Sequence, residues 1–203
     1  MNKYISILIV VVIIVLGIWF STRDKNKEEI FINSNNQAKT MNAILHTNKG
    51  DITIEFFKDQ APKTVENFTK LAREHFYDGI KFHRVIKGFM IQGGDPLTKD
   101  DTKADLWGTG DPGYKFADEI NLQSTLYSQG GYIKGIVAMA NSGPNTNGSQ
   151  FFIMATDYPL PPKYTIFGRV IAGQDVVTQI ENTPTGPGDR PVDSIVINSV
   201  TLN

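Results

Sequence analysis

The hydrophobic and polar positions divide the chain into three parts. Every residue from Ile5 to Phe20 is apolar or glycine, whereas residues 21–41 are polar, mixed in charge and poor in core-forming side chains. From residue 42 to residue 203, short apolar runs are separated by Gly, Pro and Asn. The pattern predicts an N-terminal hydrophobic segment (1–20), a polar linker (21–41) and one folded domain (42–203).

The N-terminal run is at the short end of what crosses a membrane. At about 1.5 Å per residue it would form a helix about 25 Å long, against a hydrocarbon core of roughly 30 Å. A cleaved signal peptide is the alternative, yet residues 17–22 lack the small residues that signal peptidase needs at its cleavage site. We therefore expect a retained, single-pass transmembrane helix. Lys3 on one side and Arg23 on the other leave its orientation weakly determined by charge.

The folded region reads as many short strands with two helices. Two apolar runs on either side of residues 48–51 predict a β-hairpin. A helix is predicted from Pro62, and a second helix over residues 175–181. Six further apolar runs are expected to be strands, at 80–86, 89–92, 135–140, 150–155, 165–171 and 194–202. The expected fold is mainly β: a closed, eight-stranded antiparallel β-barrel capped by two α-helices.

Composition restricts the possible functions. The chain has 203 residues, with 20 basic and 21 acidic side chains and a formal net charge of -1, so no overall field attracts nucleic acid. There are no cysteines, which excludes disulfides, thiolate metal sites and a cysteine nucleophile. The three histidines show no metal-ligand spacing, and no nucleophile motif surrounds Ser149. The G-x-G-x-x-G match at residues 108–113 follows no strand, and we interpret it as a turn.

One charged residue stands out in the predicted strand 80–86. Alternation places Ile80, Phe82, Arg84 and Ile86 on one face, so a guanidinium lies among apolar neighbours. A structural ion pair or a snorkelling side chain is the simplest interpretation of this strand taken alone.

The wider sequence favours a functional role. The segments FHRVIKGFMIQGGD (82–95) and ANSGPNTNGSQFFI (140–153) closely resemble the two signature segments of the cyclophilin family of peptidyl-prolyl isomerases. The resemblance extends from about residue 43 to the C-terminus. It implies an eight-stranded barrel with the substrate peptide in a groove on its outside, and an enzyme that accelerates rotation about Xaa-Pro bonds during protein folding. Because tethered domains of this type usually face outward, we expect an extracytoplasmic, monomeric catalytic domain.

The resemblance also implies a set of site residues. Arg84 corresponds to the catalytic arginine, and Phe89 and Gln92 complete the catalytic set. The substrate-binding positions are Phe82, His83, Met90, Ala140, Asn141, Gln150, Phe152, Leu160 and Tyr164. His83 points away from Arg84 in the predicted strand, and we expect a hydrogen-bonded structural histidine there.

Prolyl isomerisation needs no metal or cofactor. Rotation about an Xaa-Pro bond crosses a barrier of about 18–20 kcal/mol without proton transfer or a new covalent bond. In the twisted state the proline nitrogen regains its lone pair, so a fixed N–H donor on Arg84 would bind it more strongly than the planar amide. The expected partners are proline-containing polypeptides, together with the membrane. A catalytically idle peptide-binding module and a structural membrane protein are the competing interpretations.

Two segments depart from the usual family pattern. Pro159 stands where many relatives carry tryptophan, and Pro161-Pro162 replaces the usual aspartate-glycine, which leaves substrate preference and sensitivity to the family's cyclic-peptide inhibitor open. Residues 95–115 form a longer stretch than in short bacterial members. We expect that stretch to be a surface loop.

Overall fold

The computed structural model describes residues 41–128 and 130–203. The predicted anchor (1–20) and the predicted linker (21–41), apart from Met41, lie outside these residues. No helix within the described ranges combines enough length and apolar character to cross a bilayer.

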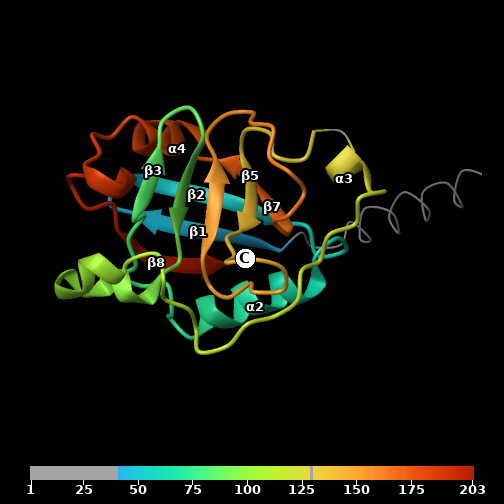
Figure 1. Ribbon diagram of the computed structural model, residues 1–203, viewed down its shortest axis with the longest axis horizontal. Coiled ribbons are helices and arrows are strands. Elements are labelled where there is room, and N and C mark those ends of the chain that lie inside the picture. Colours follow the sequence, from blue (N-terminus) through green and yellow to red (C-terminus); the bar gives the residue numbers. More distant parts are fainter. Residues whose placement is uncertain (1–40, 129) are drawn as a thin grey trace, which may run out of the picture. The chain divides into compact units, whose positions relative to one another are not determined.

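Eight strands form one sheet in the order β3-β4-β6-β5-β7-β2-β1-β8, and every neighbouring pair is antiparallel. In Figure 1 strands β3 and β5 lie in front of β1 and β2, so the sheet curls back over itself. The strands are β1 (Asn42–Thr47), β2 (Gly50–Phe56), β3 (Arg84–Ile86), β4 (Met90–Gly93), β5 (Ile136–Met139), β6 (Phe151–Met154), β7 (Ile166–Ala172) and β8 (Ile197–Leu202).

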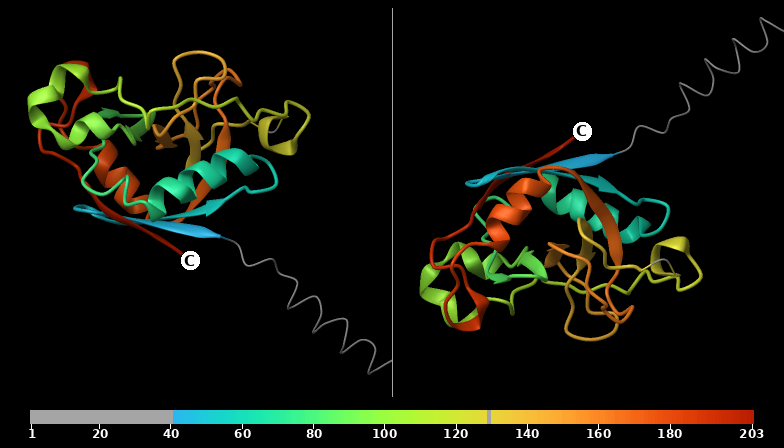
Figure 2. Two further views of the ribbon diagram at one scale, coloured as in Figure 1. Left: turned by 90° about the horizontal axis from the view of Figure 1, so that it is seen from below. Right: turned by 90° about the horizontal axis from the view of Figure 1, so that it is seen from above.

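Helices α2 and α4 close the two ends of the curled sheet (Figures 1 and 2). Their positions match the two helices predicted from the apolar spacing. The remaining helical segments are short and were not predicted. The helices are α2 (Pro62–Arg73), α3 (Thr125–Ser128) and α4 (Gln174–Glu181), and the 3-10 helices are η1 (Pro96–Lys99), η2 (Asp101–Leu106) and η3 (Pro187–Asp189).

The predicted hairpin is confirmed by the pairing of β1 with β2, which runs from Asn42 opposite Glu55 to Thr47 opposite Gly50. Gly50 has a φ of 129°, a conformation that a residue with a side chain rarely adopts. The side chains of Ala43 and Leu45 alternate into the interior, as the period of a half-buried strand requires.

One core lies inside the curled sheet, and both helices contribute to it. Phe68 of α2 is fully buried and its ring lies 4.8 Å from Tyr77 and 5.6 Å from Phe151, centroid to centroid. Val177 and Ile180 of α4 are buried in the same apolar cluster. Burial of these side chains, worth about 1.5–3 kcal/mol for each large one, makes the sheet a rigid support for the outer surface.

The prediction of a closed barrel is wrong. The sheet begins at β3 and ends at β8. Within the described residues, one isolated bridge joins Lys81 to Val196 between these edges, and backbone hydrogen bonds link residues 79–82 to residues 195–197 without forming a strand ladder. Strand β3 contains three residues, because the chain leaves strand geometry at residues 82–83. The contacts with residues 195–197 come from residues 79–82, before β3 begins, and β3 itself pairs only with β4 among the described strands, so the sheet is a curled half-barrel. The number of apolar runs does not reveal this interruption.

The stretch 95–115 is more ordered than the predicted surface loop. It contains η1 and η2, and its start and the turn at residues 108–110 meet at the buried carboxylate of Asp95. That carboxylate accepts backbone N–H bonds from Leu97 at 2.7 Å, from Gly110 at 3.2 Å and from Gly108. Asp95 therefore holds the start of this stretch against its turn at residues 108–110.

Candidate active site

Strands β4, β5 and β6 carry apolar side chains on both faces. In β6, Phe151 and Ile153 belong to the interior core, whereas Phe152 and Met154 belong to a second apolar cluster on the other face. Strands β4 and β5 alternate in the same way. Burial on both faces explains why these strands read as unbroken apolar runs instead of alternating ones.

The second cluster borders a pocket of about 350 Å³. Apolar side chains from strands and loops meet a guanidinium and two amides there. Nine of the twelve candidate site residues line this pocket: Arg84, Phe89, Met90, Gln92, Ala140, Asn141, Phe152, Leu160 and Tyr164. The cavity has the size and mixed lining of a site for a small apolar group attached to a polar chain.

Arg84 is placed at the pocket by the pairing of β3 with β4. It lies opposite Gln92 in the register, so both polar side chains reach the same side of the sheet. The side chain of Arg84 is 45% exposed, and its Nε lies 3.4 Å from Oδ2 of Asp189. Arg84 therefore presents a charged N–H donor group beside an apolar surface.

The prediction that Phe82 and Arg84 share a face is wrong. Phe82 is 1% exposed and packs in the interior, with its ring 6.3 Å from that of Phe151, whereas Arg84 faces the pocket. Strict alternation fails because residues 82–83 are not in strand conformation. Phe82 supports the sheet from inside and does not line the pocket.

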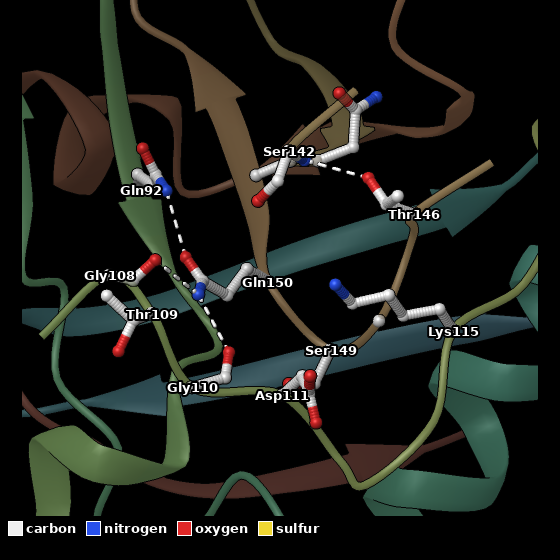
Figure 3. A pocket seen from close by; sticks show the side chains of 13 residues that line it. Gln92, Gly108, Thr109, Gly110, Asp111, Lys115, Ser142, Thr146, Ser149 and Gln150 are labelled. Atoms are coloured by element: carbon white, nitrogen blue, oxygen red, sulfur yellow. Dashed lines mark hydrogen bonds between the residues drawn. The ribbon is translucent and has the colours of Figure 1, made fainter. Parts of the chain in front are cut away.

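Gln150 belongs to a smaller, polar pocket of about 90 Å³ next to the first. Its side-chain amide donates to the carbonyl oxygens of Gly108 (3.0 Å) and Gly110 (2.8 Å), and it accepts from Nε2 of Gln92 at 3.0 Å (Figure 3). Lys115 extends toward Gln150 from the opposite side of the pocket (Figure 3). Gln92 and Gln150 thus connect the two pockets through one hydrogen bond.

His83 is buried, 6% exposed, and lines neither of these pockets. Neither of its ring nitrogens has a hydrogen-bond partner among the described residues, so the expected hydrogen-bonded histidine is not observed. Burial lowers the pKa of His83 from 6.5 to about 4, with opposing effects from the Asp95 carboxylate and the carbonyl of Lys81. The positive charges of Arg84 and Arg190 lower the pKa further, so His83 is neutral at pH 7.

The loop after β6 and residues 140–141 form another part of the wall of the larger pocket. Nδ2 of Asn141 donates to the carbonyl oxygen of Lys163 at 2.8 Å, which fixes the loop against the wall. The ring of Tyr164 lies edge-on to Phe152, with the centroids 5.4 Å apart. These contacts give the pocket a mixed aromatic and amide edge.

Two features of the site were not recognised in the sequence. Tyr158 packs its ring 4.5 Å from Phe89, and the turn at residues 108–111 forms a wall of the polar pocket. In the sequence, the only indications of these two features were the tyrosine beside Pro159 and the spacing of the glycines in the turn. Neither signal identifies a pocket wall unless the neighbouring strands are already placed.

No group of three or more His, Cys, Asp or Glu side chains suited to a metal ion occurs within residues 41–128 and 130–203. The polar groups at the larger pocket are instead donors and acceptors for a peptide: a guanidinium, the amides of Gln92 and Asn141, and a phenol. An apolar pocket with such a border can bind a ring and hold the chain on either side of it.

The curled sheet with its outward pocket has the form of a peptide-binding enzyme. The family model for cyclophilin type peptidyl-prolyl cis-trans isomerases matches residues 42–202. The chain belongs to this family, and it is an enzyme that catalyses cis/trans isomerisation of Xaa-Pro bonds in protein folding.

Similar proteins come from distant organisms. Peptidyl-prolyl cis-trans isomerase CYP18-1 of Arabidopsis thaliana is 50% identical over 164 residues, covering 80% of this chain and 96% of the plant protein. Peptidyl-prolyl cis-trans isomerase A of Mycobacterium tuberculosis is 46% identical over 188 residues, covering 84% and 96%. The crystal structure of a cyclophilin type isomerase of Cryptosporidium parvum superposes with a TM-score of 0.71 at 37% identity, covering 81% of this chain and 98% of that one.

Proposed function

We propose that the proline ring of the substrate binds in the 350 Å³ pocket against Phe89, Met90, Phe152 and Leu160. Arg84 donates to the proline nitrogen while the bond is twisted, and Gln92 holds the peptide backbone. The observation that carries this proposal is the meeting of one guanidinium with four apolar side chains in a single cavity. A relative from Cryptosporidium parvum, crystallised in the presence of the dipeptide Ala-Pro, supports the choice of ligand.

Catalysis follows from the difference between the planar and the twisted amide. The planar amide is the more dipolar of the two, so an apolar pocket that excludes water disfavours it relative to the twisted state. The guanidinium acts in the same direction, because the nitrogen lone pair becomes available only on twisting. The pocket also holds the ring while the acyl side turns, which removes part of the orientational cost.

Phe89→Ala should raise KM for an Xaa-Pro peptide by about tenfold, because a partly buried ring contributes roughly 1.5 kcal/mol of apolar contact. Phe76→Ala is the matched control, since Phe76 is also partly buried but does not line the pocket. Peptide titration monitored by NMR line shapes gives affinity and exchange rate together. Equal effects of the two substitutions would contradict the assignment of the pocket.

We also propose that residues 1–20 tether the catalytic domain to a membrane, on its extracytoplasmic side. The unbroken apolar run from Ile5 to Phe20 supports the tether. We propose further that the catalytic domain acts as a monomer: the nine side chains at the pocket come together within one chain, so the proposed site needs no residue from a second copy.

In cells that produce the full chain, the protein should sediment with membranes in high salt and dissolve in detergent. A variant that lacks residues 1–20 should remain in the supernatant. Protease added outside the cytoplasmic membrane should degrade the domain of the full-length protein. Protection until that membrane is opened would show that the domain faces the cytoplasm, and release of the full-length protein by salt would contradict the tether.

A further inference from the structure

Arg84 has one charged contact that lies outside the pocket. Its Nε donates to Oδ2 of Asp189, 3.4 Å away, and within the described ranges no other carboxylate is within ion-pair distance of Arg84. Asp189 is far away in sequence, in the turn between α4 and β8. The pairing occupies the nitrogen nearest the stem, which leaves the two terminal nitrogens of the guanidinium for other partners.

The turn fixes the backbone that carries Asp189. Asp189 has a φ of 59° and follows Gly188 with a φ of 73°, two consecutive residues in the left-handed region. The turn is closed by the backbone hydrogen bond from Gly186 N to Arg190 O at 2.8 Å. It is closed again by the bond from Val192 N to Pro184 O at 2.9 Å. Because aspartate has a short side chain, a fixed backbone at Asp189 limits how far its carboxylate can reach.

The next residue attaches this turn to the ordered excursion between β4 and β5. The guanidinium of Arg190 lies 4.5 Å from the ring centroid of Trp107, and its Nη2 donates to the carbonyl oxygen of Ala104 at 2.6 Å. Trp107 in turn donates from Nε1 to the carbonyl oxygen of Leu97 at 3.1 Å.

We propose that Asp189 is a positioning residue for the isomerisation reaction. Through its ion pair with Nε it holds the guanidinium of Arg84 at the edge of the pocket, so that the terminal N–H groups are already directed at the substrate. This inference rests on the role proposed above for Arg84. It adds a residue that does not line the pocket, together with the turn and the Arg190–Trp107 contact that support it.

The physical reason lies in the length of the arginine side chain. A half-exposed arginine samples many rotamers. Holding its guanidinium in the one geometry that reaches the proline nitrogen costs side-chain entropy during the reaction. An ion pair with Asp189 reduces the number of rotamers that Arg84 samples, although Asp189 does not touch the substrate. Such an effect strengthens an interaction made in the transition state, so it should change kcat and leave KM alone.

The test is a double-mutant cycle on the full chain. Asp189→Asn should lower kcat about three- to fivefold with KM unchanged, the loss expected for one half-exposed ion pair. Asparagine tolerates the left-handed backbone, so the turn is retained. In an Arg84→Ala background the same substitution should have no further effect. In about 1 M KCl, where the Debye length is about 3 Å, the effect of Asp189→Asn should shrink.

Glu55→Gln is the matched control, because Glu55 accepts from Nε of Arg169 at 2.7 Å away from the pocket. It should leave kcat unchanged. An Asp189→Asn variant with normal kcat, or one equally impaired in the Arg84→Ala background, overturns the positioning role. Full activity of Arg84→Ala itself would instead overturn the catalytic assignment of Arg84, so the two failures are distinguishable.

Discussion

Arg84→Ala is expected to lower kcat for an Xaa-Pro peptide by about ten- to a hundredfold, with KM within about twofold of the unchanged enzyme. The substitution removes a charge-assisted hydrogen bond worth about 1.5–3 kcal/mol that forms only when the proline nitrogen has its lone pair. The apolar pocket remains and continues to bind the ring. Cis/trans exchange rates measured by NMR over a range of peptide concentrations separate the two constants.

Two further variants test this interpretation. Arg84→Lys keeps the charge but loses the planar fork, so we expect an activity between those of the alanine variant and the unchanged enzyme. Arg169→Ala is the matched control, because Arg169 is 58% exposed and paired through Nε but does not line the described pocket. If Arg169→Ala were as impaired as Arg84→Ala, the loss would reflect general destabilisation and the assignment would be wrong.

The second large effect is a loss of stability in acid that depends on His83. The pKa of His83 is about 4 in the folded protein and 6.5 for an unperturbed histidine. Between pH 6.5 and pH 4, this histidine is therefore protonated more fully in the unfolded chain than in the folded protein. The stabilisation by the neutral side chain is complete above pH 6.5 and is lost as the pH falls toward 4. The expected decrease in the free energy of unfolding is about 3 kcal/mol.

Urea unfolding at pH 7 and pH 4 measures this effect. His83→Gln should show a decrease smaller by about 3 kcal/mol, because glutamine does not titrate. His75→Gln is the control, since His75 is exposed. This variant should show the same decrease in the free energy of unfolding as the unchanged protein. Identical pH dependence in the His83→Gln variant and the unchanged protein would contradict the buried, neutral state of His83.

Local patterns predicted the regular elements well. The hairpin around Gly50 and the helices at Pro62 and at residues 175–181 follow from turn chemistry and apolar spacing, which depend on near neighbours. The prediction of a closed barrel was wrong because closure depends on the backbone at residues 82–83. Both side chains are buried there, but the chain does not belong to a strand. Nothing in the identity of Phe82 and His83 signals that interruption.

The site was predicted by resemblance more than by periodicity. Alternation singled out Arg84 as a charged residue among apolar neighbours, yet it also placed Phe82 beside it, and the structure separates the two on opposite faces. The ion pair with Asp189 could not be foreseen, because the two residues are 105 positions apart and meet through the return of the chain after α4. Long-range pairs of exposed charges leave no pattern in one sequence.

The alternation along β4, β5 and β6 also limits how this enzyme can change its preferences. Met90 and Phe152 share their strands with interior residues such as Ile91 and Ile153, so a replacement that shifts the backbone disturbs interior and pocket together. Leu160 lies on the loop after β6, so replacing it does not shift a strand that also carries interior side chains. Divergence in client selection is therefore expected to accumulate in that loop, while the strand positions stay nearly invariant.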